Sequence, residues 1–163
     1  MPNHEEQSSM SPPPVIACLR VLHYAILDSS IGFLCGHGLF FVGRKEIGRA
    51  PCLAICQERD SHQVLLQYCE RDWTPLGAAS FETVADAKKR PERIYPGSLA
   101  CWTEARVTEE EANRYLDELF GAERCSFCNK RPDEVRQMFS GDDNTLICDK
   151  CIEEFHTRLR ESS

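Results

Sequence analysis

Four cysteines close to the C-terminus form two Cys-x-x-Cys pairs separated by nineteen residues. Each pair predicts a tight turn that directs two sulfur atoms to one point, and the intervening segment can bring the second turn opposite the first. Zn²⁺ accepts the resulting tetrahedron of thiolates, with Zn–S bonds of about 2.3 Å. Four thiolates leave no open position for water, so we expect one structural Zn²⁺ per chain and no catalytic role for it. The predicted ligands are Cys125, Cys128, Cys148 and Cys151.

The residues around these cysteines narrow the interpretation. Cys125-Ser-Phe-Cys-Asn-Lys130 is followed by Asp133-Glu-Val-Arg136, Gly141 and Leu146-Ile-Cys-Asp-Lys-Cys-Ile152. This segment, about residues 123–161, resembles the N-terminal zinc-binding domain of the ClpX unfoldases, whose pattern runs CSFCGK…EV…G…ICDECV. The resemblance implies a small treble-clef-like module that dimerises and binds adaptors and unfolded protein substrates.

The match has two departures, Asn129 where glycine is usual and Phe155-His156 where Leu-Cys is usual. The 163 residues also contain no G-x-x-x-x-G-K-[ST] phosphate-binding loop. The resemblance therefore implies binding and dimerisation, not the ATP-driven motor.

Charge and cysteine usage restrict the class of protein. The net charge is −7, and residues 51–121 alone carry 13 acidic and 8 basic side chains, which disfavours a nucleic-acid interface built on clustered Lys and Arg. The six cysteines outside the paired motif are scattered, several of them within apolar runs, where a reduced cysteine behaves as a small hydrophobe. Reduced thiols beside a zinc site favour the cytoplasm, and the first residues do not have the basic start of a secretory signal.

The N-terminal third is the least patterned part. Residues 1–14 are polar with three consecutive prolines, and we expect a disordered leader. In residues 15–50, Val15, Leu19, Leu22 and Ile26 follow helical spacing, which predicts a helix starting near Pro14. The apolar stretch over residues 15–34 contains charged residues, so we expect no membrane span.

Residues 51–121 predict an acidic α+β domain with a small, mostly antiparallel sheet and two helices on one face. Apolar runs 52–57 and 63–69 flank a polar turn and predict a hairpin. A helix is expected over 81–90 with Ser80 as its cap, and a strand over 99–106. Thr108 and Glu111 form the sequence pattern of a capping box for a second helix that ends at Gly121.

Residues 122–163 predict the zinc module, with a short helix after Pro132, a strand over 145–147 and a final helix over 149–160. Its apolar side chains exceed what a module of this size can bury. We expect the surplus to form an exposed patch, which usually marks an interface. The patch residues are expected among Phe127, Val135, Met138, Phe139, Leu146, Ile147, Ile152, Phe155 and Leu159.

Other chemically suggestive residues have simpler explanations. His156 follows the last cysteine, but the final helix should carry it away from the metal. Cys35-Gly-His37 has no partner motif and predicts a glycine-rich turn. Trp73 and Trp102 are expected to pack in the core or at a sheet edge, and the Lys88–Arg90 run to form a solvated helix face.

These observations favour a cytoplasmic, bacterial protein-interaction or adaptor protein, with no catalytic residues assigned. Its expected partners are a client protein or a second copy of the chain, with a possible link to a Clp-type protease or chaperone system. One alternative is an enzyme whose active site lies in residues 51–121 and whose zinc is purely structural. The other is a nucleic-acid-binding zinc protein, which the acidic charge disfavours.

Overall fold

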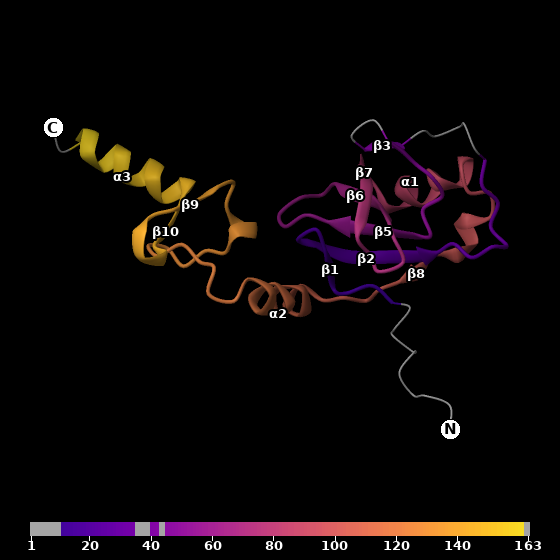
Figure 1. Cartoon of the computed structure of the whole chain (residues 1–163), viewed down its shortest axis with the longest axis horizontal. Coiled ribbons are helices and arrows are strands. Elements are labelled where there is room, and N and C mark those ends of the chain that lie inside the picture. Colours follow the sequence, from indigo (N-terminus) through magenta and orange to yellow (C-terminus); the bar gives the residue numbers. More distant parts are fainter. Residues whose placement is uncertain (1–10, 35–39, 43–44, 162–163) are drawn as a thin grey trace, which may run out of the picture. The chain divides into compact units, whose positions relative to one another are not determined.

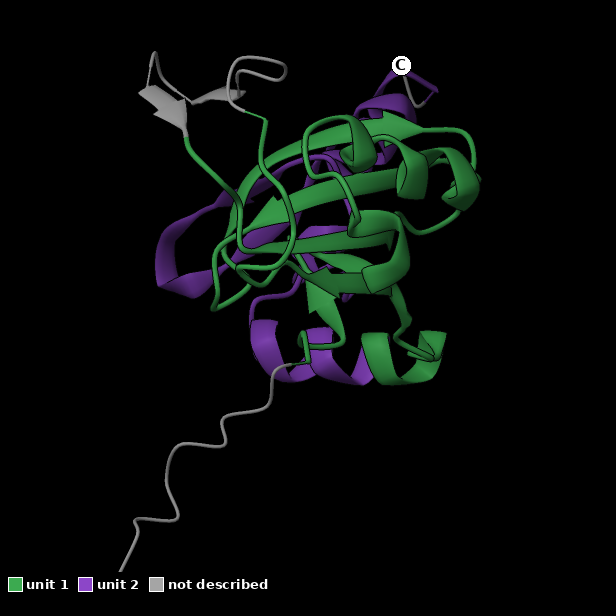
Figure 2. Ribbon diagram, turned by 90° about the vertical axis from the view of Figure 1, so that its right-hand side faces the viewer, with its two compact units in different colours: residues 1–112 green, residues 113–163 purple. Residues whose placement is uncertain are grey.

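The computed structural model describes residues 11–34, 40–42 and 45–161 of the chain (Figure 1). The chain divides into two compact units, unit 1 (residues 1–112) and unit 2 (residues 113–163), which Figure 2 colours green and purple. The fold class is α+β, as predicted, with an antiparallel half-barrel sheet in unit 1 and the four cysteines in unit 2. No helix in the described ranges is long and apolar enough to cross a membrane.

The sheet of unit 1 is antiparallel throughout and has the strand order β1-β2-β5-β6-β7, with β8 paired to β2. The predicted hairpin is confirmed, since Cys52 of β5 faces Cys69 of β6 and the register continues to Gln57 opposite Val64. The strands are β1 (Val15–Ile16), β2 (Leu19–Ile26), β5 (Cys52–Gln57), β6 (Val64–Cys69), β7 (Pro75–Phe81) and β8 (Thr103–Glu104). A separate pair consists of β3 (Phe40–Val42) and β4 (Lys45–Ile47).

The predicted helix after Pro14 is wrong, because this segment forms β1 and β2 of the same sheet as residues 52–81. Both faces of β2 contact apolar neighbours, so its hydrophobic residues do not alternate strictly and their spacing imitates a helix. Val21 packs in one cluster and Ala25 in the other. The sheet therefore combines strands from the two segments that the sequence analysis separated at residue 51.

The two faces of the sheet carry different cores. One face packs Leu53, Ile55 and Leu66 against helix α1 (Val84–Lys89) and the turns that follow it. The other face is lined by small side chains, among them Cys52, Cys56 and Cys69, and is closed by Trp73, whose ring meets Tyr24 edge to face at 5.8 Å. Trp73 is therefore a core residue, as expected.

Turns and helices around the sheet differ from expectation in detail. Thr83, not Ser80, caps α1, since its Oγ1 accepts the Asp86 N–H at 3.1 Å. The strand expected over 99–106 is mostly wrong: residues Ser98–Cys101 form a 3-10 helix, η2, and only β8 pairs with the sheet.

Pro91 begins another 3-10 turn, η1 (Pro91–Arg93), because its ring cannot supply the N–H that would continue α1. Trp102 packs against the core on the α1 side and donates from Nε1 to the Lys88 carbonyl at 3.3 Å.

Helix α2 (Glu109–Phe120) confirms the predicted capping box. The Glu111 N–H donates to Thr108 Oγ1 at 3.1 Å, and the Thr108 N–H donates to Glu111 Oε2 at 3.0 Å. Gly121 ends the helix with φ 52°, a left-handed conformation that glycine adopts without strain. The boundary between the two units falls inside α2, after Ala112. Only the first turn of this helix therefore belongs to the same unit as the sheet.

Unit 2 contains a two-stranded sheet of β9 (Met138–Ser140) and β10 (Leu146–Cys148), followed by helix α3 (Asp149–Glu161). The predicted short helix at Pro132 is a 3-10 turn, η3 (Pro132–Glu134), and a second 3-10 turn, η4 (Asp142–Asn144), joins the two strands. The expected strand before the second cysteine pair and the expected final helix are both confirmed.

Candidate metal centre

The first cysteine pair lies on a tight turn closed by backbone hydrogen bonds. The Asn129 N–H donates to the Cys125 carbonyl at 2.8 Å, and the Cys125 N–H donates to the Lys130 carbonyl at 2.9 Å. Asn129 has φ 60°, in the left-handed region that asparagine tolerates better than other residues with a Cβ. This conformation explains why asparagine can replace the glycine that is usual at this position in the family pattern.

The second pair is divided between a strand and a helix. Cys148 is the last residue of β10 and faces Met138 of β9, whereas Cys151 lies in the first turn of α3. The junction is fixed by a reciprocal pair of hydrogen bonds: the Asp149 N–H donates to the Gln137 carbonyl at 3.0 Å, and the Gln137 N–H donates to Asp149 Oδ1 at 3.2 Å.

Ser126 joins the two turns directly. Its N–H donates to the Leu146 carbonyl at 2.7 Å, and its Oγ accepts the Leu146 N–H at 3.1 Å. The serine between the first two cysteines therefore holds β10 beside the first turn, which brings the second pair opposite the first.

The four sulfur atoms form a compact cluster whose dimensions fit a tetrahedral metal. All four Sγ atoms lie within 4.8 Å of one another, with 3.7 Å between Cys125 and Cys151 and 3.6 Å between Cys128 and Cys148. A tetrahedron with Zn–S bonds of about 2.3 Å has edges of about 3.8 Å, whereas a disulfide would require about 2.05 Å. The residues present thus fit one Zn²⁺, and no pair of them is a disulfide.

Burial and backbone donors have opposing effects on these thiols. Burial disfavours the thiolate of Cys125, but N–H groups of Cys128, Phe127 and Cys148 point at its sulfur and lower its pKa to about 6. At Cys151, burial and hydrogen bonds with the neighbouring thiols raise the pKa. A cation at the centre of the cluster would offset the charge of four thiolates, which the protein groups alone do not do.

The sulfur cluster is surrounded by a small hydrophobic core. Cys125, Cys148 and Cys151 are buried, and partly buried apolar side chains pack against them. These are Val135, Met138 and Ile147. A core of this size is too small to hold a segment of about 50 residues together, so the metal would carry a large part of its stability.

Arg131 is a buried structural residue of the metal module that its sequence pattern did not reveal. It is 4% exposed, and its guanidinium forms a bidentate pair with Asp133 at 2.9 and 3.2 Å. The same group donates to the Asn113 backbone carbonyl and side-chain oxygen and to the Asp117 carboxylate, both residues of α2. Arg131 therefore attaches the second half of α2 to the metal module, and both lie in the compact unit that begins at residue 113.

Among the residues that the structure describes, the other candidates do not belong to the sulfur cluster. His156 is exposed on α3 and does not belong to the sulfur cluster. The Cys35-Gly-His37 segment lies outside the described residues. Cys52, Cys56 and Cys69 are buried in the sheet of unit 1.

Comparison with known protein families agrees with this geometry. The family model of the ClpX C4-type zinc finger matches residues 123–161. No solved structure matches the chain. The match, the spacing of the four cysteines and the size of their sulfur cluster lead to the same conclusion: residues 123–161 are a ClpX-type C4 zinc finger, a zinc-binding module at the C-terminal end of this chain.

Proposed function

We propose that this chain is a protein-interaction protein whose zinc finger binds other protein surfaces and pairs with itself. The observation that carries the proposal is a row of exposed apolar side chains on the module. Ile152, Phe155 and Leu159 of α3 are 40%, 36% and 71% exposed and recur at the spacing of one helix face. Phe127 of the first cysteine turn, 56% exposed, extends the row by packing edge to face on Phe155, with ring centroids 5.3 Å apart.

This row, which we call the α3 stripe (Phe127, Ile152, Phe155 and Leu159), is held in place by the metal. Phe127 lies between two of the cysteines, and α3 begins directly after the third and contains the fourth. Loss of the metal would therefore remove the stripe together with the fold that presents it. Exposed apolar patches on small modules usually mark interfaces.

The family match supports a protein–protein role, and a Clp-type unfoldase or protease system is the first place to look for a partner. Unfolded client segments are the second class of partner, since extended apolar residues can cover the stripe. We propose a structural role for the zinc and a non-catalytic function for the chain. The acidic charge of the protein makes nucleic acid a poor partner.

The test is sedimentation of the zinc-loaded full chain at increasing concentration. We expect reversible self-association that Leu159→Asp abolishes. Leu159 is chosen over Phe155 because Phe155 also supports Phe127, so its replacement would disturb the module itself.

Thr157→Asp is the matched control, since it adds the same charge to an exposed position on the opposite side of α3. A strict monomer at high micromolar concentration, or equal effects of the two substitutions, would refute self-association through the stripe. Zinc content and circular dichroism must stay unchanged in both variants.

A further inference from the structure

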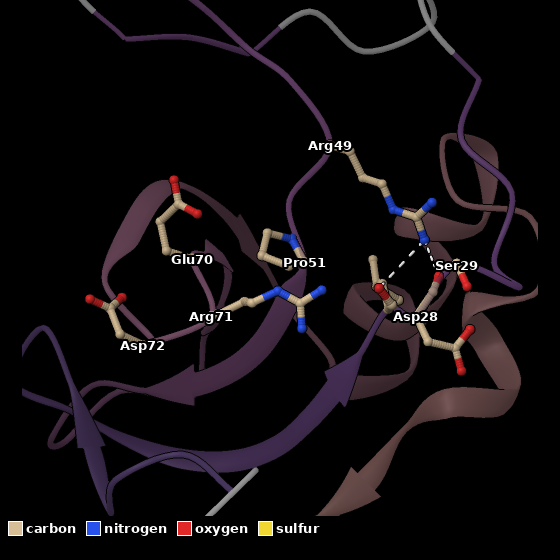
Figure 3. Close-up of a pocket in the computed structure, with 8 residues that line it drawn as sticks. Asp28, Ser29, Arg49, Pro51, Glu70, Arg71 and Asp72 are labelled. Atoms are coloured by element: carbon tan, nitrogen blue, oxygen red, sulfur yellow. Dashed lines mark hydrogen bonds between the residues drawn. The ribbon is translucent and has the colours of Figure 1, made fainter. Parts of the chain in front are cut away.

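A hollow of about 760 Å³ opens in unit 1 where three segments meet at one end of the sheet. Residues 27–29 follow β2, residues 49–51 precede β5, and residues 70–72 form the turn between β6 and β7. The hollow is far from the zinc finger in the sequence and plays no part in the function proposed above. Two arginines, Arg49 and Arg71, direct their guanidinium groups toward it (Figure 3).

Arg49 is held in place without being neutralised. Its Nη2 donates to the backbone carbonyls of Leu27 and Asp28, and no carboxylate in the described part of the chain forms an ion pair with it. Because both bonds use one nitrogen, the N–H groups on Nε and Nη1 remain to bind a ligand. Carbonyl groups fix the guanidinium. Hydrogen bonds from Ser30 are the main cause of the lowered pKa of Asp28, to which the charge of Arg49 also contributes, but Arg49 and Asp28 form no ion pair.

Arg71 stands at the tip of the β6–β7 turn, between two acidic residues, Glu70 and Asp72. It forms no ion pair with either of them or with any other described residue, and Figure 3 shows both carboxylates turned away from its guanidinium. The turn is closed by backbone bonds, from the Glu70 N–H to the Thr74 carbonyl at 2.9 Å and from the Trp73 N–H to the Glu70 carbonyl at 3.0 Å. The base of the Arg71 side chain is therefore fixed by a structured loop.

Two of the three acidic groups that line the hollow, Asp28 and Asp72, are hydrogen-bonded within their own loops, and the third, Glu70, points away from the Arg71 guanidinium (Figure 3). Asp28 Oδ1 accepts from the N–H and the Oγ of Ser30, at 2.7 and 2.5 Å, and Asp72 Oδ1 accepts the Thr74 N–H at 2.9 Å. These bonds direct the carboxylates into the turns that they stabilise. Leu27 and Pro51 supply the apolar part of the wall, beside Ser29.

We propose that this hollow binds a small organic oxyanion, a carboxylate or a phosphate monoester with an apolar body, between Arg49 and Arg71. Two guanidinium groups provide the planar donor pairs that carboxylate and phosphate oxygens accept. The volume exceeds what an inorganic anion needs and lies in the range of sites for small molecules. Leu27 and Pro51 would contact the body of the ligand.

The test is an NMR titration of the zinc-loaded, ¹⁵N-labelled full chain at constant ionic strength. The probes are phenyl phosphate and benzoate, with benzyl alcohol as the neutral control. We expect saturable shifts of the Ser29 and Arg71 amide signals with at least one of the two anions and none with benzyl alcohol. Which anion binds more tightly distinguishes phosphate from carboxylate ligands.

Arg71→Gln should weaken the binding at least tenfold without affecting the fold, since Arg71 makes no ion pair within the described chain. Arg59→Gln is the matched control, because Arg59 lies in the β5–β6 turn at the opposite end of the same strands. Absence of saturable shifts with both anions would overturn the proposal. Equal weakening by both substitutions, or no effect of Arg71→Gln, would overturn it too, and none of these outcomes bears on the α3 stripe.

Discussion

Replacing Arg131 should weaken zinc binding although Arg131 does not touch the sulfur atoms. Its side chain is 5% exposed and that of its partner Asp133 is 4% exposed, so Arg131→Met leaves a buried carboxylate without its cation. Breaking a buried ion pair in this way costs about 3–5 kcal/mol, whereas the contact with the half-exposed Asp117 adds at most about 1 kcal/mol. We take about 3 kcal/mol as the expected loss.

This loss should appear as weaker metal binding. A small zinc module without a sufficient core folds only with its metal, so its folding energy is part of the apparent binding energy. A loss of about 3 kcal/mol corresponds to a decrease of more than 100-fold in the apparent zinc affinity. Competition with a chelator of known affinity, at fixed pH, measures this change in the full chain.

Two further variants test whether the buried Arg131–Asp133 pair determines the zinc affinity. Arg124→Met removes a pair with the half-exposed Asp117 and a 3.3 Å bond to the Asn129 carbonyl, and it should change the zinc affinity less than about fivefold. Arg131→Met combined with Asp133→Leu replaces both buried charges with apolar side chains and should recover much of the affinity. An affinity for Arg131→Met within threefold of the wild type would refute the argument, as would a double variant weaker than Arg131→Met.

Three other outcomes follow from the structure. Chelation of zinc should make unit 2 exchange its amide hydrogens rapidly while the strands of unit 1 stay protected, and equal protection of both units would contradict a structural metal. Burial raises the pKa of Cys69 to about 12, so this thiol should resist iodoacetamide at pH 8 in the native protein while the exposed Cys18 reacts, as peptide mass spectrometry can show. Burial, with the nearby charge of Lys88, lowers the pKa of His23, so the folded state binds fewer protons than the unfolded state and the stability of unit 1 should fall as the pH drops below about 6.5. Urea unfolding at pH 7 and pH 5 measures this loss, which His23→Gln should reduce.

The parts of the structure that the sequence predicted are those fixed by local chemistry. The capping box of α2, the turn at Gly121 and the hairpin of β5 and β6 each depend on residues close together in the chain. The cluster of the four cysteines belongs to this class as well, because each Cys-x-x-Cys turn is a local structure and only the distance between the two turns had to be bridged. Ser126, which bridges it, lies within the motif.

The errors occurred where distant residues decide the structure. Val15, Leu19, Leu22 and Ile26 satisfy helical spacing, yet the strand β5 pairs with Leu19–Ile26 from more than 25 residues away and forces an extended backbone. A short apolar segment buried on both faces carries no period that separates strand from helix. The hollow at the end of the sheet was missed for the same reason, since its two arginines come from loops that only the folded sheet brings together.

Arg131 has both a local contact, with Asp133, and distant contacts, with α2. The distant contacts link the zinc finger to residues outside its motif. The arginine stands inside the motif, three residues after Cys128, but its contacts with Asn113 and Asp117 reach back into α2. A motif-based boundary at residue 122 cuts through this network and would leave the guanidinium with only Asp133. We therefore expect the metal site, the exposed α3 stripe and the end of α2 to fold as one cooperative unit, so that a change in α2 alters the metal affinity. A shortened module beginning at residue 122 should accordingly bind zinc more weakly than the full chain, and equal affinities would show that the arginine network does not contribute.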